Sequence, residues 1–452
     1  MLIAALAIRV GYIDGTPFRP VNDASIYNIL GSGIARTGDY ATGSGPRTGA
    51  GGSRGPTAYF PPGFPYFLAA ADILDGHQAG GKPAIRGDRI AQAIAGTVAV
   101  GLVGLVALEA FGAAVALAAM VLAAVYPVFV VLSGTLVAEN LLIVFELAAI
   151  WTALRARRAR RPYAWIAAAG VLTGLATLTH ENAILLVIPL GFAAFSAARP
   201  PPNRGRPGVR ALAGPTTLLI ITLATIAPWT IRNAVELHHF VPVSDETGIT
   251  LAGTYNPASA AFRPLPYKWR FFWEIPEDQR LRRTAGRYSE VELGDKLQAQ
   301  ATRYIAAHPL SPLQVGYRNT LRLFELEGAY AWHASALAIG MPVSDAHIGV
   351  LAFWVLCLLA LAGIPTTAAR RAPRWIWLIP VLYALSIVFV NTETPRFREP
   401  IDPFLVLLAG CAVATGLQRL ALGLRGAPVR RGRRPSRLAG DAQLIEMGER
   451  LP

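Results

Sequence analysis

The class of the fold is decided by IAQAIAGTVAVGLVGLVALEAF (residues 90–111), a nearly unbroken apolar stretch. A helix needs about 20 mostly apolar residues to cross the hydrocarbon core of a bilayer. Two stretches of the same character follow directly, at 113–132 and 134–154. Of the 452 residues, 53% are hydrophobic and 15% are charged, whereas soluble domains carry about 25% charged residues. This composition excludes a soluble globular protein and a disordered chain.

Further apolar windows extend this pattern along the chain. The nine windows that are long and apolar enough to span, or nearly so, are 90–111, 113–132, 134–154, 163–179, 182–198, 211–231, 348–368, 374–391 and 400–419. The start, 1–13, is apolar but short, and it lacks the polar tail and small-residue cleavage site of a signal peptide. We interpret it as the outer part of a first span. The sequence therefore predicts an all-α polytopic membrane protein with about ten transmembrane helices.

Clusters of arginine set the orientation of these spans. They lie at 156–161, 199–210, 370–374 and 418–438. Cytoplasmic loops of membrane proteins carry an excess of Lys and Arg, and ten spans with a cytoplasmic N-terminus place all four clusters inside. This placement explains the net charge of +14 as a topology signal beside anionic lipid. We therefore expect the lipid bilayer, and not nucleic acid, as the partner of the basic residues.

The same topology places two long segments, 14–89 and 232–347, outside as large extracytoplasmic loops. Short amphipathic pieces at 24–36 and 64–75 predict interfacial helices, and a further helix is expected at 290–308. The expected division of the chain is an N-terminal transmembrane module, the second loop, a C-terminal set of spans and a basic cytoplasmic tail, at 1–231, 232–347, 348–419 and 420–452. The expected location is the plasma (inner) membrane.

Ionisable side chains at membrane depth are costly and usually functional. In the predicted topology, several of them gather at the outer face from five separate parts of the chain. They are Asp23, Glu139, His180, Glu181, Arg232, Arg396 and Arg398. Carboxylates and arginines in one layer can hold an anionic ligand beside a general base.

A purely structural interpretation of each residue stays open at this point. Asp23 can cap a helix that begins at Ala24, since Asp is a favoured N-cap. Glu139 can make a structural hydrogen bond, and the polar pair at 180–181 is ordinary for a tight hairpin. Glu146, on the same helical face as Glu139, can line a cavity or pair within the bundle. The arginines can serve as interfacial anchors.

The combination of groups favours one kind of chemistry. The planar guanidinium of arginine matches phosphate oxygens, and a neighbouring carboxylate can deprotonate an acceptor hydroxyl. Together they indicate glycosyl transfer from a sugar linked to a polyprenyl phosphate, with the lipid in the bilayer and the phosphate at its outer boundary. A soluble nucleotide-sugar donor fits poorly, because the sequence has no Rossmann fingerprint and no large cytosolic domain.

Several motifs, in order along the chain, carry a resemblance to a known family. They are VNDASIYNIL (21–30), PTAYFPPGFPYFLAA (56–70), AAVYPVFVVLSGTLVAENLL (123–142), GVLTGLATLTHENAILLVIPL (170–190), IAPWTIRN (226–233) and TPRFREPIDPFLVLLAG (394–410). The sequence resembles the GT-C superfamily of membrane glycosyltransferases, in the branch of bacterial protein O-mannosyltransferases and lipid A aminoarabinose transferases.

The resemblance implies roles for the matching residues. Asp23 would be the catalytic base, and Glu139, His180 and Glu181 would orient the acceptor or hold a divalent metal ion. The donor phosphate would be bound by arginines, and the cavity wall would include tyrosines; the residues in question are Arg232, Arg396, Arg398, Tyr27 and Tyr59. The partners implied are a polyprenyl-phosphate-linked sugar and an extracytoplasmic acceptor, whether protein, lipid or polysaccharide.

The sequence also departs from the family pattern. Asp23 is followed by Ala24, where many relatives have two consecutive acidic residues, and the hairpin has His180 and Glu181 where a basic residue is common. We expect inverting transfer at the outer membrane surface, with no protein nucleophile. The rival interpretations are a polytopic transporter or lipid flippase and a non-catalytic assembly partner with the same fold.

Overall fold

A computed structural model describes residues 1–42, 55–76, 85–198 and 212–426 of the chain. The chain divides into two units, Met1–Ala414 and Thr415–Pro452, and the candidate site described below lies in the first unit. The glycine-rich stretch of the first loop, the arginine-rich loop at 199–210 and the tail beyond 426 fall wholly or mainly outside the described residues.

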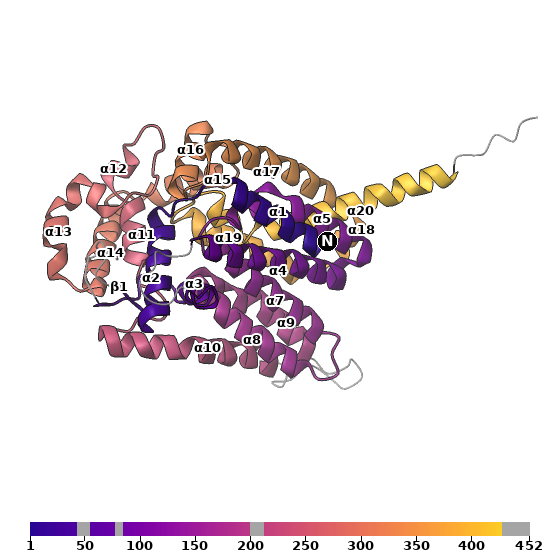
Figure 1. Ribbon diagram of the computed structural model, residues 1–452, viewed down its shortest axis with the longest axis horizontal. Helices are drawn as coiled ribbons and strands as arrows, with labels where there is room; N and C mark the ends of the chain where they lie inside the picture. Colours follow the sequence, from indigo (N-terminus) through magenta and orange to yellow (C-terminus); the bar gives the residue numbers. More distant parts are fainter. Residues whose placement is uncertain (43–54, 77–84, 199–211, 427–452) are drawn as a thin grey trace, which may run out of the picture. The chain divides into compact units, whose positions relative to one another are not determined.

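Helices occupy all ten windows predicted from apolar sequence (Figure 1). They are α1 (Leu2–Gly15), α4 (Ile85–Phe111), α5 (Ala113–Val125), α6 (Pro127–Leu132), α7 (Glu139–Ala156), α8 (Pro162–Thr179), η1 (Glu181–Leu186), α9 (Val187–Ala198), α10 (Ala213–Leu237), α17 (Val343–Gly363), η7 (Arg374–Trp377), α19 (Leu378–Val388) and α20 (Asp402–Gly426). Within the described residues, six helical segments are long and apolar enough to cross a membrane. The protein is therefore helical and multi-pass, while the count of ten spans stays a prediction.

Local sequence explains why some windows give shorter helices than expected. Pro127 has no N–H to donate and ends α5 at Val125, so the window 113–132 is split into α5 and α6. The following window begins with turns, and its helix starts only at Glu139. As a result, Glu139 lies at the beginning of α7 and not within a continuous helix.

Most of the remaining helices and the two short strands belong to the two predicted loops. The first loop contains α2 (Asn22–Thr37), the two-residue strands β1 (Ala41–Thr42) and β2 (Gly55–Pro56), which pair in antiparallel fashion, and α3 (Gly63–Leu74). The second contains α11 (Thr247–Thr254), α12 (Pro257–Ala260), η4 (Phe272–Glu274), η5 (Pro276–Asp278), α13 (Gln279–Thr284), η6 (Ala285–Arg287), α14 (Glu290–Ala307), α15 (Ser311–Leu323) and α16 (Ala329–Ala338). Helices are thus present at 24–36, 64–75 and 290–308, as predicted.

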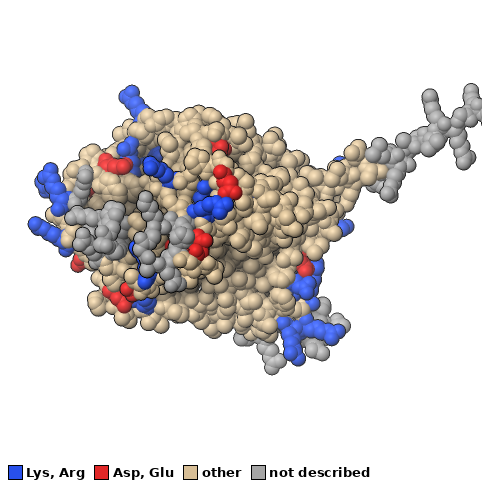
Figure 2. Space-filling view, viewed as in Figure 1, with Lys and Arg blue, Asp and Glu red and all other residues tan. Residues whose placement is uncertain are grey.

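These loop helices gather at one end of the unit. Figure 1 shows α2 and α11 to α14 at that end, with α4, α5, α7 and α9 extending away from it. On the face seen in Figure 2, charged side chains concentrate at the two ends, and a broad band between them carries almost none. This distribution is the one expected for a bundle embedded in a bilayer.

Small residues bring the bundle helices close together. A Cβ atom at Gly170 would lie 2.9 Å from the Leu218 carbonyl oxygen, and one at Gly174 would lie 2.5 Å from Cβ of Thr225. The GVLTG sequence of α8 therefore lets its backbone approach α10, in the small-xxx-small manner common between membrane helices. This contact fixes the end of α8, where the candidate site begins.

Candidate functional site

A cavity of about 460 Å³ lies among the loop helices and the adjoining ends of the bundle helices. Its walls come from α2, the segment before α3, the turn between α8 and η1, α11, residues 268–274, α16, α19 and the segment before α20. Five of the residues predicted from sequence line it: Asp23, Tyr59, His180, Glu181 and Arg396. The fold therefore brings together residues from four distant parts of the chain.

The Arg396 guanidinium joins the two most important predicted carboxylates. Its Nε donates to Oε1 of Glu139 at 2.6 Å, and its Nη1 donates to Oδ2 of Asp23 at 2.5 Å. Glu139 is fully buried, whereas the Asp23 side chain keeps 28% of its surface exposed. Asp23 thus lines the cavity, and its Oδ1 atom takes no part in the ion pair with Arg396.

Asp23 is not an N-cap. Helix α2 begins at Asn22, its N-cap residue is Val21, and this helix start has no side-chain capping hydrogen bond within the described residues. The capping interpretation, which placed the helix start at Ala24, is therefore wrong. Asn22 instead donates from Nδ2 to the Ala338 carbonyl oxygen of α16 at 2.9 Å, and this contact helps to hold Asp23 at the cavity wall.

The hairpin residues His180 and Glu181 form another part of the cavity wall. α8 ends at Thr179, and His180 continues in extended conformation, so that both side chains turn into the cavity. Glu181 Oε2 accepts a hydrogen bond from the Ser244 hydroxyl at 2.5 Å. His180 Nδ1 is buried and has no hydrogen-bond partner in the part of the chain that the structure describes.

The two tyrosines differ in position. Tyr59 lines the cavity directly. Tyr27 is buried behind the wall and packs on Phe60 and Phe64, with ring centroids 4.5 and 4.9 Å away. Tyr27 therefore supports the lining residue Phe60 instead of lining the cavity itself.

Two of the predicted arginines do not line this cavity. Arg232 donates to the carbonyl oxygens of Thr57 and Tyr40 at 2.7 and 2.6 Å, and its guanidinium lies 4.8 Å from the Trp229 ring centroid. These contacts fasten α10 to the loop around the β1–β2 pair. The prediction that Arg232 binds phosphate stays untested, and we do not include this residue in the proposed site.

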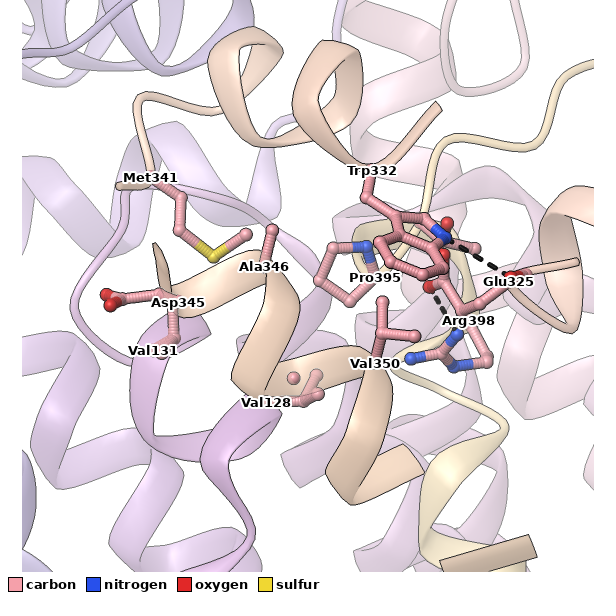
Figure 3. A pocket seen from close by; sticks show the side chains of 12 residues that line it. Val128, Val131, Glu325, Trp332, Met341, Asp345, Ala346, Val350, Pro395 and Arg398 are labelled. Atoms are coloured by element: carbon pink, nitrogen blue, oxygen red, sulfur yellow. Dashed lines mark hydrogen bonds and ion pairs between the residues drawn. The ribbon is translucent and has the colours of Figure 1, made fainter. Parts of the chain in front are cut away.

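Arg398 lies in a separate, closed part of the molecule (Figure 3). Its Nη1 donates to Oε1 of Glu325 at 2.7 Å, its Nε donates to Oδ1 of Asp402 at 3.1 Å, and the ring of Phe353 lies 3.5 Å away. The cavity beside it measures about 10 Å³, which is room for about one water molecule. This geometry gives Arg398 a structural environment and no access to the large cavity.

Sequence reasoning missed several residues of the cavity wall. They are Glu246, Lys268, Trp269, Arg270, Phe271 and Glu393. The stretch YKWRFFWE (267–274) carried a signal, because basic and aromatic residues alternate in it. Lys268 pairs with Glu393 at 2.8 Å, whereas no ion pair of Arg270 is found among the described residues. Arg270 is therefore a cavity cation without a carboxylate partner in that part of the chain.

Glu246 adds a third carboxyl group next to Asp23 and Glu181. Burial raises the pKa of Glu246 well above its ordinary value, and the negative charges of Glu181 and Asp23 raise it further. A carboxyl group with a raised pKa stays protonated and neutral at a pH where ordinary carboxyl groups are ionised. The site therefore contains one carboxyl group, Glu246, that holds its proton more tightly than an ordinary carboxyl group does.

The cavity residues do not form a recognisable set of metal ligands in the part of the chain that the structure describes. In the described ranges, no group of three or more His, Cys, Asp or Glu side chains is placed to hold a metal ion. The Arg396 guanidinium already fills the space between Asp23 and Glu139. These residues, as arranged, do not fit a divalent ion bound between the two carboxylates.

Comparison with known proteins supports the family resemblance. Residues 60–231 match the family model of dolichyl-phosphate-mannose-protein mannosyltransferases. The matched part runs from the segment before α3 into α10 and so contains Glu139, His180 and Glu181, but neither Asp23 nor Arg396. No curated protein matches the chain.

The solved structure of an archaeal oligosaccharyltransferase shares the fold, and a second membrane protein aligns at a lower score. The archaeal oligosaccharyltransferase AglB from Archaeoglobus fulgidus, in complex with an inhibitory peptide and a dolichol-phosphate, aligns with a TM-score of 0.53 at 16% identity, over 96% of this chain and 52% of that one. The ArnT protein from Cupriavidus metallidurans, bound to undecaprenyl phosphate, aligns with a TM-score of 0.42 at 16% identity, over 94% and 78% of the two chains.

This chain spans about half the length of the archaeal oligosaccharyltransferase. The likeness at this level of identity concerns the fold. The GT-C resemblance predicted from sequence motifs is thus confirmed, both by the family model over α3 to α10 and by the fold.

Proposed function

We propose that this protein transfers a sugar from a polyprenyl-phosphate donor to an acceptor hydroxyl, with inversion of configuration and with Asp23 as the base. One observation carries the proposal: Asp23 faces a cavity of about 460 Å³, Arg396 (itself bound by Glu139) contacts its Oδ2 atom, and its Oδ1 atom has no hydrogen bond among the described residues. The GT-C fold and the family model support this reaction class.

The chemical step follows from the position of Asp23. Oδ1 of Asp23 accepts the proton of the acceptor hydroxyl as that oxygen attacks the anomeric carbon of the sugar. The new carbon–oxygen bond forms on the face opposite to the phosphate, and the bond to the phosphate oxygen breaks. The polyprenyl phosphate leaves with the electron pair, and no covalent sugar–protein intermediate forms.

The leaving phosphate needs a cation that is not already neutralised. Arg396 is engaged by Asp23 and Glu139, and Lys268 is engaged by Glu393. Arg270 lines the same cavity, and the described residues give it no carboxylate partner. We assign the donor phosphate to Arg270, with Lys268 beside it, because stabilisation of developing charge is often the largest contribution to catalysis.

The remaining wall residues suit a sugar. The rings of Trp269 and Phe271 lie 4.5 Å apart and offer apolar surface for a pyranose face. The raised pKa of Glu246 favours its protonated form, which can donate a hydrogen bond to a sugar hydroxyl without adding negative charge beside Asp23. His180 and Glu181 are the residues we assign to orienting the acceptor.

The lipid part of the donor requires an apolar exit. Leu337 of α16 and Ile387 and Val390, in and after α19, line the apolar side of the cavity. A polyprenyl chain leaving along this side would reach the bilayer, with the phosphate at its boundary. We place the site at the extracytoplasmic face of the plasma (inner) membrane, because the arginine clusters belong to the opposite face.

The test is transfer of a labelled sugar from a polyprenyl-phosphate donor in membranes that contain the wild type or Asp23→Asn. We expect transfer to fall by about 10²- to 10⁴-fold, the usual contribution of a general base, with donor binding retained. The matched control is Asp39→Asn, an exposed aspartate of the same loop, which should leave transfer unchanged. Normal transfer by Asp23→Asn would refute the base, and lipid movement across the bilayer without any bond broken would favour the transporter or flippase interpretation.

A further inference from the structure

Two histidines on neighbouring helices face one another outside the proposed catalytic site. Nε2 of His333, on α16, lies 3.0 Å from Nε2 of His347, on α17. The ring centroids are 5.0 Å apart, and the edge of Trp332 packs against His347. His347 is exposed and His333 is half-buried, so the two nitrogens meet at the surface. Neither residue has a role in the proposed transfer reaction.

The separation of the two nitrogens fits a shared metal ion. Zinc–nitrogen bonds are about 2.0–2.1 Å long, so two imidazole nitrogens on one ion lie about 2.9 Å apart at a right angle and about 3.4 Å apart at the tetrahedral angle. The distance of 3.0 Å in this protein falls between these limits. Two neutral imidazoles can also share one hydrogen bond at this distance, which makes a direct test necessary.

We propose that His333 and His347 form a two-histidine binding site for a divalent transition-metal ion of the Zn²⁺ type. Imidazole nitrogen is a preferred ligand of Zn²⁺, Cu²⁺ and Ni²⁺, whereas Mg²⁺ and Ca²⁺ prefer oxygen ligands. Water completes the coordination from the exposed side of His347. With two protein ligands, the site binds more weakly than the closed four-ligand sites of structural zinc proteins.

A metal ion at this position would act on the wall of the large cavity. Helix α16, which carries His333, lines that cavity through Ala334 and Leu337. The carbonyl oxygen of Ala338, at the end of the same helix, accepts the hydrogen bond from Asn22, the neighbour of Asp23. The ion would tie α16 to α17 and so fix the part of the wall that positions the first residues of α2.

The experiment measures binding of Zn²⁺ alone to the purified full chain by isothermal titration calorimetry. We expect one Zn²⁺ per chain, and at least about tenfold weaker binding for His347→Ala, because even outer-shell changes at metal sites cost about 10–100-fold in affinity. The matched control is His308→Ala, an exposed histidine whose Nδ1 contacts only the Tyr304 carbonyl oxygen among the described residues. It should bind as the wild type does.

A second variant separates metal binding from a simple hydrogen bond. His347→Gln keeps a group that can hydrogen-bond to His333 but is a poor ligand for Zn²⁺, so it should lose binding as His347→Ala does. Zn²⁺ should also raise the melting temperature of the wild type and not that of His347→Gln. Equal Zn²⁺ binding by the wild type and both His347 variants, or no binding by the wild type, would overturn the proposal. Neither outcome bears on the proposed transfer reaction.

Discussion

Arg396 and Arg398 are two residues apart in the short 3-10 helix η8 (Arg396–Arg398), both are buried, and both pair with two carboxylates, yet they belong to different parts of the molecule. Arg396 reaches Asp23, which is open to the large cavity. Arg398 reaches Glu325 and Asp402, whose side chains are 4% and 0% exposed. The difference is access: Asp23 in the Arg396 network borders a cavity that a substrate can enter, whereas both carboxylates of the Arg398 network are enclosed.

A buried ion pair can stabilise the fold or take part in catalysis, depending on whether it borders a cavity. Removing one partner of a closed ion pair leaves an uncompensated charge in the interior, which is costly. A pair that opens on a cavity can exchange its counter-ion contacts for contacts with a ligand. We therefore expect substitutions in the Arg398 network to lower thermal stability and substitutions in the Arg396 network to lower sugar transfer.

The largest effect is expected in the closed network. Arg398→Ala leaves Glu325 and Asp402 buried without their cation, so we expect a loss of about 3–5 kcal/mol in the free energy of unfolding. Thermal unfolding in detergent measures this loss, and the exposed Arg370→Ala serves as the control. An unchanged melting temperature for Arg398→Ala would remove the structural role that we assign to this residue.

Lysine substitutions should affect the two arginines in different ways. Arg396→Lys keeps the positive charge but cannot contact both Asp23 and Glu139 with one planar fork. Loss of one charged hydrogen bond is worth about 1.5–3 kcal/mol, so sugar transfer should fall by about ten- to a hundredfold. Arg398→Lys should lower the melting temperature and leave transfer per folded molecule unchanged. The opposite pattern would exchange the roles of the two arginines.

Donor recognition should depend on the cavity and not on the other predicted arginines. We expect Arg270→Ala to weaken binding of polyprenyl phosphate by about ten- to a hundredfold, since a charged contact to the phosphate is lost. Arg232→Ala should bind the lipid normally and be less stable, because its guanidinium holds the carbonyl oxygens of Thr57 and Tyr40. Fluorescence titration with a labelled polyprenyl phosphate distinguishes the two, and normal binding by Arg270→Ala would place the phosphate elsewhere.

The smallest effect concerns pH. The pKa of Glu246 is raised in the folded protein, so this carboxyl group stays protonated above its usual range and ionises as the pH rises further. Ionisation adds a negative charge beside Asp23 and Glu181, and transfer should decline on this basic limb. Glu246→Gln is neutral at every pH and should flatten the limb in a pH–rate profile. A limb that persists unchanged in this variant would belong to another group.

Apolar sequence was sufficient to predict the helical membrane architecture, because each span must carry its own run of apolar residues. The predicted orientation of the spans also placed Asp23, Glu139, His180, Glu181 and Arg396 at one face. It placed Arg232 and Arg398 there as well, and these two do not line the cavity, so the sequence indicated a common layer and not the membership of the site.

The rest of the site depends on contacts that no local pattern specifies. Nothing in the sequence TPRFREP separates Arg396 from Arg398, because a 3-10 turn of three residues directs them toward different neighbours. Glu246 and Arg270 lie in a loop region with short helices and no apolar periodicity, so their approach to Asp23 is decided by tertiary packing. Arg232 donates to backbone carbonyl groups of the first loop, a tertiary contact that its sequence neighbourhood does not reveal.

The most direct test of the central claim is an experimental structure of the protein with polyprenyl phosphate bound. The proposal predicts the phosphate in the cavity of about 460 Å³, within hydrogen-bonding distance of Arg270 and on the same side as Asp23, with the lipid chain leaving past Leu337 and Ile387. Phosphate bound at Arg232 or Arg398, with the large cavity empty, would contradict it.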